Sequence, residues 1–306
     1  MYGNNLLVGI GDWSKEESKH SRKGKAPSGG TRKFSGKFSS LLPVYLRTSS
    51  QYGTFIFKMT FFAPASNVKD VTPLWFIAEP FSSLSHITVA ICLVLSSRGL
   101  ARNLTCKRAK VGSFLYVLGT SLTMAISGIY HMIPPHTFLR LVFRRLDHAM
   151  IFFGISAVFS GAHFSCFTTF PTMYFTPIIL WTCALIGTIQ KTLYFDLLSD
   201  LGTTVVYLAC GWLGLISSAI LYAHYGKQCL SGLLHLLLGG IYYSVGAVVG
   251  LVFRNFVVVE NVIHAHEVFH ILCALGVYRH FRFVKFCLTQ LHPMRFTMVQ
   301  DRSKVE

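Results

Sequence analysis

Seven apolar runs of about 20 residues follow one another along the chain. A helix of that length crosses the hydrocarbon core of a bilayer, so each run predicts one membrane-spanning helix. The runs are roughly Leu74 to Ser97, Val111 to Ile133, Leu146 to Phe167, Thr172 to Ile189, Thr203 to Tyr225, Ser231 to Phe253 and Phe256 to His280. Backbone polar groups cannot stay unpaired in lipid. The pattern therefore predicts an all-α membrane protein, a seven-transmembrane helix bundle.

The composition strengthens the assignment to the membrane class. Of the 306 residues, 52% are hydrophobic and 13% are charged, and the mean hydropathy is +0.50. A soluble domain usually has about 25% charged residues. The eight cysteines are scattered singly, and most are expected to pack as small hydrophobic residues rather than form a disulfide framework. An ordinary soluble domain is therefore excluded.

Basic residues gather at the beginning of the chain. Eleven of the 28 Lys and Arg residues precede residue 70, in sequence rich in Gly and Ser. Such a composition buries too little apolar surface to order itself, so residues 1 to 70 are predicted to be a largely disordered tail. The seven-span domain is predicted at 71 to 282 and a short tail at 283 to 306. We expect the basic tail to contact anionic lipid headgroups, and we expect no nucleic acid partner.

The last run contains the segment His266-Glu267-Val268-Phe269-His270. Two histidines four positions apart lie on one face of a helix, so both imidazoles can reach one metal ion. The segment also fits the H-E-x-x-H pattern of zinc hydrolases, in which Glu267 would be the general base. Two histidines and a glutamate in a membrane-length run are costly unless they have partners, which favours a functional site.

Further polar residues border the second and third runs. The second run ends with Ser127-x-x-x-His131, and Asp147 lies at the start of the third. Because consecutive spans alternate in direction, the end of the second span and the starts of the third and seventh lie on the same side of the membrane. His131, Asp147, His266 and His270 are therefore predicted to converge at one depth.

Asp147 and Ser127 also have simpler interpretations. Asp147 could pair with Arg144 or Arg145 at a helix start, where a carboxylate also suits the helix dipole. Ser127 could hydrogen-bond a carbonyl of its own helix, as serines in membrane helices often do. The residues alone leave both alternatives open.

Six segments between Glu79 and His280 form a recognisable set: Glu79-x-x-Ser82-x-x-x-His86, Ser127-x-x-x-His131, Leu146-Asp147-His148, His266-x-x-x-His270, Tyr207 to Trp212 and Gly239 to Gly246. With these motifs the sequence resembles the hemolysin III and progestin/adiponectin-type receptor family of seven-span membrane proteins. Many hemolysin III-like members have Asn at the position of Ser82, so the first motif departs from the family pattern there.

The resemblance implies a zinc ion held by His131, His266 and His270, with Asp147 and Ser127 around the fourth coordination position. The wider superfamily includes alkaline ceramidases, which implies hydrolysis of an amide in a lipid. Three imidazoles leave one position for water. Asp147 would orient that water and accept its proton, and Ser127 would donate a hydrogen bond.

Three further residues are candidate accessory residues. Glu79 and His86 are seven positions apart and share a helical face, which suggests a structural pair or a substrate gate. Glu267 is the general base only if the metalloprotease interpretation holds. Family members vary at its position, which argues against a required carboxylate there.

Three functional classes are compatible with these features. The first is a zinc-dependent hydrolase of lipid amide or ester bonds, with a ceramide-like substrate entering from the bilayer. The second is a receptor or signalling protein that binds a lipid-like ligand and in which the zinc is structural. The third is a hemolysin-like protein that perturbs membranes, for which the runs offer no charged pore lining.

Overall fold

The computed structural model of the chain describes residues 74, 77–101, 104, 106–169, 171–260 and 262–292. The predicted amino-terminal tail lies outside the described residues, as does the chain after residue 292. The helices are α1 (Pro80–Ala101), α2 (Lys107–Met132), α3 (Phe138–Cys166), α4 (Phe175–Leu193), η1 (Phe195–Leu197), α5 (Asp200–Trp212), α6 (Gly214–Tyr225), η2 (Gly226–Cys229), α7 (Leu230–Val252), α8 (Ala265–Phe286) and η3 (Cys287–Leu291). One hairpin joins α7 to α8, with β1 (Val257–Val259) antiparallel to β2 (Ile263–His264).

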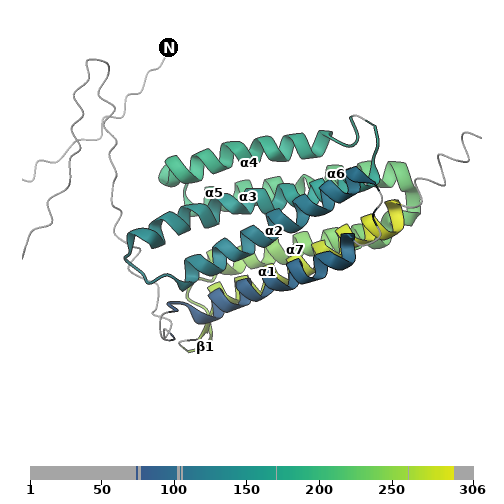
Figure 1. The fold of residues 1–306 in the computed structure, drawn as a ribbon. Helices are drawn as coiled ribbons and strands as arrows, with labels where there is room; N and C mark the ends of the chain where they lie inside the picture. Colours follow the sequence, from purple (N-terminus) through teal and green to yellow (C-terminus); the bar gives the residue numbers. More distant parts are fainter. Residues whose placement is uncertain are drawn as a thin grey trace, which may run out of the picture. The chain divides into compact units, whose positions relative to one another are not determined.

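The long helices lie side by side as a bundle, and each predicted run contains one of them (Figure 1). The fifth run is covered by α5 and α6, which are separated only at Leu213. Four helical stretches among the described residues are long and apolar enough to cross a membrane, namely Pro80–Leu100, Lys107–Met132, Phe138–Cys166 and Asp200–Val252. The protein is therefore an all-α membrane protein.

Large apolar side chains cover the outside of the bundle. Leu95, Phe114 and Leu185 are between 60% and 63% exposed, although each belongs to a long helix. In water such a surface would be unfavourable, whereas lipid chains solvate it. The outward faces of the helices are thus suited to contact with the bilayer.

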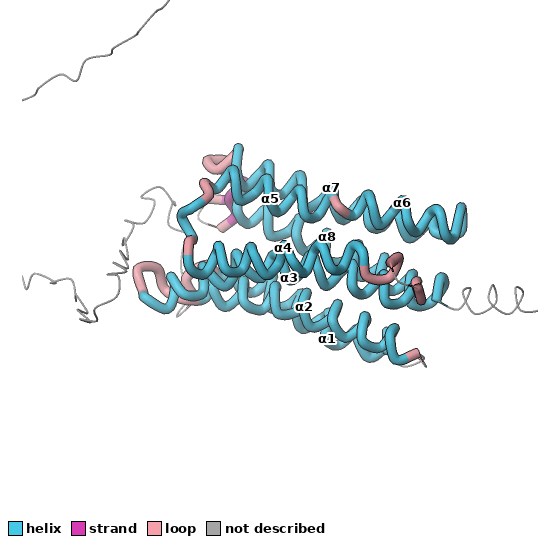
Figure 2. Tube along the Cα trace, turned by 90° about the horizontal axis from the view of Figure 1, so that it is seen from above, coloured by secondary structure: helices cyan, strands magenta, loops and turns pink. Residues whose placement is uncertain are grey.

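Small residues allow neighbouring helices to approach closely. A Cβ atom added to Gly119 of α2 would lie 2.6 Å from Cβ of Ala157 in α3, and one added to Gly112 would lie 3.0 Å from the backbone oxygen of Ser160. Small residues play this role at helix interfaces in membranes because lipid gives no hydrophobic drive to association. The contact between α2 and α3 holds His131 and Asp147 on adjacent helices (Figure 2).

Buried polar side chains also connect the helices. His163 of α3 is fully buried and is hydrogen-bonded through Nε2 to Ser217 Oγ of α6, at 2.8 Å. Trp181 Nε1 of α4 donates to Ser160 Oγ of α3 at 2.9 Å. These bonds satisfy polar groups that have no water to pair with in a bilayer interior.

Two predicted boundaries are wrong. The third span was expected to begin at Leu146, but α3 begins at Phe138, because Thr137 caps the helix by accepting a hydrogen bond from the Arg140 amide. The last span was expected to begin at Phe256. Residues 257–259 and 263–264 instead form the hairpin, where β-branched side chains favour strands, and α8 starts at Ala265. The α8 helix also continues to Phe286, into the predicted carboxy-terminal tail.

Candidate metal centre and its cavity

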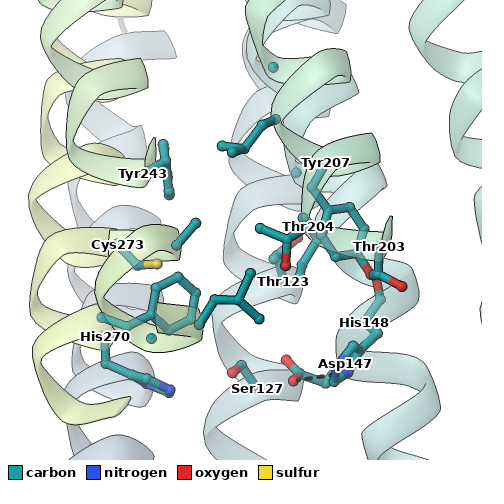
Figure 3. Close-up of a pocket in the computed structure, with 18 of the residues that line it drawn as sticks. Thr123, Ser127, Asp147, His148, Thr203, Thr204, Tyr207, Tyr243, His270 and Cys273 are labelled. Atoms are coloured by element: carbon teal, nitrogen blue, oxygen red, sulfur yellow. Dashed lines mark hydrogen bonds and ion pairs between the residues drawn. The ribbon is translucent and has the colours of Figure 1, made fainter. Parts of the chain in front are cut away.

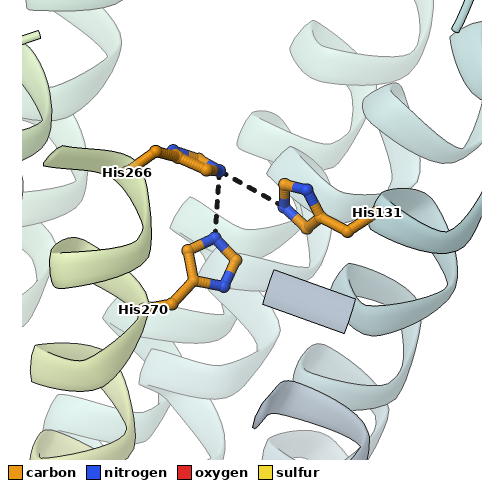
Figure 4. Close-up of side chains that lie close together, drawn as sticks. All are labelled: His131, His266 and His270. Atoms are coloured by element: carbon orange, nitrogen blue, oxygen red, sulfur yellow. Dashed lines mark hydrogen bonds between the residues drawn. The ribbon is translucent and has the colours of Figure 1, made fainter. Parts of the chain in front are cut away.

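Three histidine side chains converge at one end of the bundle. His131 lies in the last turn of α2, and His266 and His270 lie in the first two turns of α8. The Nε2 atom of His266 is 3.4 Å from that of His131 and 3.0 Å from that of His270 (Figure 4). All three ligand atoms lie within 4.8 Å of one another. The predicted convergence of these histidines is confirmed.

The local sequence explains why these nitrogens meet. The four-residue spacing on α8 places His266 and His270 one above the other on the same face. His131 approaches from α2, whose end lies on the same side of the bundle as the start of α8. His270 is 1% exposed and His131 is 2% exposed. Two of the three histidines are therefore buried, whereas His266 is exposed.

The donor set fits a metal ion. Ligand atoms on a tetrahedral metal with metal–nitrogen distances near 2.0–2.1 Å are separated by about 3.3 Å, close to the two separations from His266 Nε2 to His131 Nε2 and His270 Nε2. Imidazole is a ligand for zinc, copper, iron and nickel. Three close histidines, two of them buried, could thus bind a divalent metal ion.

Glu79 fixes the protonation of His131. Its carboxylate, just before α1, is hydrogen-bonded to Nδ1 of His131. An ionised carboxylate only accepts hydrogen bonds, so Nδ1 carries the proton and the Nε2 lone pair faces the other two histidines. Carboxylate–histidine pairs of this kind commonly orient metal ligands.

Arg140 of α3 pairs with the other carboxylate oxygen of Glu79, and its second nitrogen donates to the Ile133 carbonyl at 2.6 Å. Of the two interpretations of Glu79 and His86, a structural pair or a substrate gate, the pair is not formed, because the partners of Glu79 are His131 and Arg140. The approach of Arg140 depends on the turn between α2 and α3, which sequence spacing does not reveal. Arg140 was therefore missed at the sequence level.

His86 contacts the histidine group by ring stacking and not as one of its three members. It is 3% exposed, and its ring is stacked on that of His270, with ring centroids 3.9 Å apart and an interplanar angle of 23°. Neither ring nitrogen of His86 has a hydrogen-bond partner among the described residues. Its position supports the orientation of His270 and does not form a second metal group.

Glu267 has both carboxylate oxygens engaged. One accepts a hydrogen bond from Ser82 Oγ at 3.0 Å, and the other accepts from the His264 amide at 2.9 Å. The second bond satisfies a free amide at the start of α8, and the negative charge suits the positive end of the helix. This arrangement makes Glu267 a helix cap that ties α8 to α1, which argues against a role as general base.

The histidines line a cavity of about 1190 Å³ between the helices. Ser127 and Asp147 line the same cavity, and Figure 3 shows both side chains facing it from neighbouring helices. Asp147 does not belong to the three-residue metal group. The structure thus places the two predicted catalytic residues in the same cavity as the three histidines but not within their group.

The simpler interpretations of Asp147 and Ser127 are not what the described residues show. Arg145 donates to the Thr192 carbonyl at 2.8 Å, and Arg144 lies over the Phe195 ring, so neither forms the expected pair with Asp147. The nearest ionisable partner of Asp147 is His148, at 3.8 Å between Oδ2 and Nδ1. Ser127 Oγ makes no hydrogen bond within the described part of the chain.

The comparison with known families agrees with the fold and the site. The sequence profile of haemolysin-III related proteins matches residues 74–281, which is about two thirds of the chain and includes every residue of the histidine group. The matched range begins just before Glu79 and ends within α8. The chain therefore belongs to the haemolysin-III related family of integral membrane proteins.

Proposed function

We propose that this protein crosses the membrane seven times, holds a zinc ion with His131, His266 and His270, and hydrolyses an amide or ester bond of a lipid. The observation that carries the proposal is the convergence of three imidazole nitrogens at the wall of a large cavity that also exposes a hydroxyl and a carboxylate. The seven spans are α1, α2, α3, α4, the α5–α6 pair, α7 and α8.

The cavity supports a lipid-like occupant. Residues of α8 from His266 to His280 line it, and this length of helix corresponds to about 21 Å at 1.5 Å per residue. Val158, Phe159 and Leu236 contribute apolar walls away from the histidines. A space of this length and polarity suits an acyl chain, with the bond to be cleaved next to the metal centre.

The side chains around the centre have complementary roles in this proposal. A bound zinc ion supplies Lewis acidity and favours ionisation of a water molecule at neutral pH. Asp147 accepts a proton and holds the attacking water in position, and Ser127 donates a hydrogen bond to oxygen that becomes negative during the reaction. Glu79 keeps His131 in the correct tautomer.

Metal analysis tests the central part of this proposal. The purified wild-type chain is expected to contain about one zinc per chain, measured by inductively coupled plasma mass spectrometry. His270→Ala should lose most of it, whereas His235→Ala, which alters a histidine of α7 outside the group, should retain it. Equal zinc content in the wild type and His270→Ala would refute the proposed site.

A structural role for the metal is the second candidate, and one observation favours it. The ligands come from α2 and α8, which are far apart in the sequence, and Glu79 and His86 link the same centre to α1. A metal that joins three helices can stabilise a receptor without performing chemistry. Loss of thermal stability on chelation, without any lipid turnover by the metal-loaded protein, would favour this alternative.

A further inference from the structure

Lys191 is a buried cation in the last turn of α4. Its side chain is 2% exposed, and its Nζ donates to Thr203 Oγ1 at 2.7 Å. An ammonium group has three donors, and this is its one hydrogen bond among the described residues. Lys191 lines the same cavity as His131.

A second cation lies next to Lys191. The Arg144 guanidinium is 4.8 Å from the centroid of the Phe195 ring, and Lys191 Nζ is 4.9 Å from the same centroid. Arg144 also lines the cavity. Two positive charges therefore share one aromatic ring at the edge of the cavity.

None of the described carboxylates forms an ion pair with either of these two cations. Asp200 and Asp196 are close enough to attract Lys191 through space, but Asp200 is already paired with Arg254 at 3.0 Å. No carboxylate in the described part of the chain lies within ion-pair distance of Arg144 or Lys191. Asp196 lines the cavity nearby without forming such a pair.

A buried ammonium without a direct ion pair is costly. The Phe195 ring and the carbonyl end of α4 offset part of this cost, because both attract a positive charge. Neither supplies a full negative charge, and two neighbouring cations also repel each other. An anion that enters the cavity would gain charge-assisted hydrogen bonds from both side chains.

We propose that Lys191 and Arg144 bind the phosphate group of a lipid whose chain occupies the cavity. This inference rests on the part of the proposed function that places a lipid there. Two adjacent positive charges match a phosphate, which carries up to two negative charges, better than a singly charged carboxylate. The substrate or ligand class becomes a phosphate-bearing lipid rather than a neutral one.

Displacement of a bound lipid tests this site without measuring turnover. The full chain in dodecyl maltoside micelles is loaded with radiolabelled monoacylglycerol phosphate. Unlabelled monoacylglycerol phosphate should displace it at concentrations about tenfold or more below those needed for the neutral monoacylglycerol of the same chain length. Inorganic phosphate should displace little, because it lacks the apolar chain.

Substitutions then test whether Lys191 and Arg144 cause the preference for the phosphate lipid. Lys191→Gln and Arg144→Gln should each weaken binding of the phosphate lipid about tenfold and leave binding of the neutral lipid unchanged. Lys191→Arg should retain most of the preference because it keeps the charge. Lys227→Gln, an exposed substitution at the other end of the bundle, should behave as wild type. Arg144 is exposed, so its variant tests the site even if Lys191→Gln fails to fold.

Equal displacement by the two lipids would overturn the phosphate site while leaving a lipid cavity in place. Displacement by inorganic phosphate as effective as that by the lipid would assign the two cations to free phosphate and overturn the headgroup role. Binding of neither lipid would refute both this inference and the lipid part of the proposed function. Unchanged binding of the phosphate lipid in both Lys191→Gln and Arg144→Gln would also overturn the proposed phosphate site.

Discussion

Glu79 accepts a hydrogen bond from Nδ1 of His131, so a carboxylate before the first helix sets the tautomer of a ligand at the end of the second. Loss of this bond should weaken metal binding without removing a ligand. Glu79→Gln is expected to lower zinc affinity about 10–100-fold, measured by competition with a chelator of known affinity. Glu260→Gln, an exposed change in the hairpin loop, should have no effect. Unchanged affinity in Glu79→Gln would show that His131 is oriented by other contacts.

Substitution of Asp147 or Ser127 should lower the rate of hydrolysis and leave the zinc content unchanged. With the proposed reaction, Asp147→Asn is expected to reduce turnover of a short-chain ceramide that carries a phosphate group about 100-fold or more, and Ser127→Ala at least about tenfold. Zinc content should stay at the wild-type level, because neither side chain belongs to the histidine group. Turnover equal to wild type in Asp147→Asn would remove its assigned role.

Glu267 should contribute to stability rather than to catalysis. Glu267→Gln weakens the bond to the His264 amide and removes a charge from the start of α8. We expect destabilisation by about 1 kcal/mol, seen as a lower melting temperature in detergent, with turnover changed little. A loss of turnover at unchanged stability and zinc content would instead support the metalloprotease-like role for Glu267.

The close approach of α2 and α3 should be sensitive to one added methyl group. Gly119→Ala would place Cβ 2.6 Å from Cβ of Ala157, and neither atom can rotate away. The expected destabilisation is about 1–3 kcal/mol, measured by thermal denaturation in detergent. Gly99→Ala in α1 meets no atom within 4 Å and should be neutral or stabilising. Equal melting temperatures for the two variants would contradict this account of the interface.

Sequence spacing predicted the part of the site that depends on helix periodicity and alternation of direction. The i, i+4 relation fixed His266 and His270, and the alternation of spans brought His131 to them. The same reasoning missed Arg140 and Lys191, because a positive charge near a predicted span end reads as a solvated surface residue. Their contacts depend on side-chain reach and on turns, which have no period in the sequence.

Boundaries were predicted less well for a related reason. The third run begins at Leu146 in the sequence pattern, yet α3 extends back to Phe138 because Thr137 caps the helix, and Arg140 within this extension pairs with Glu79. The hairpin before α8 was read as helix because its residues are apolar. An apolar run indicates that a segment is buried or in contact with lipid. Over short lengths it does not distinguish a strand from a helix.

The position of the histidines at helix ends has a thermodynamic consequence. His131 lies in the last turn of α2 and His266 in the first turn of α8, where backbone amides and carbonyls lack partners within the helix. If a metal binds there, part of the free energy of binding orders these two termini further. Metal affinity and local amide exchange become linked quantities, so a substitution that orders either helix end raises affinity without touching a ligand.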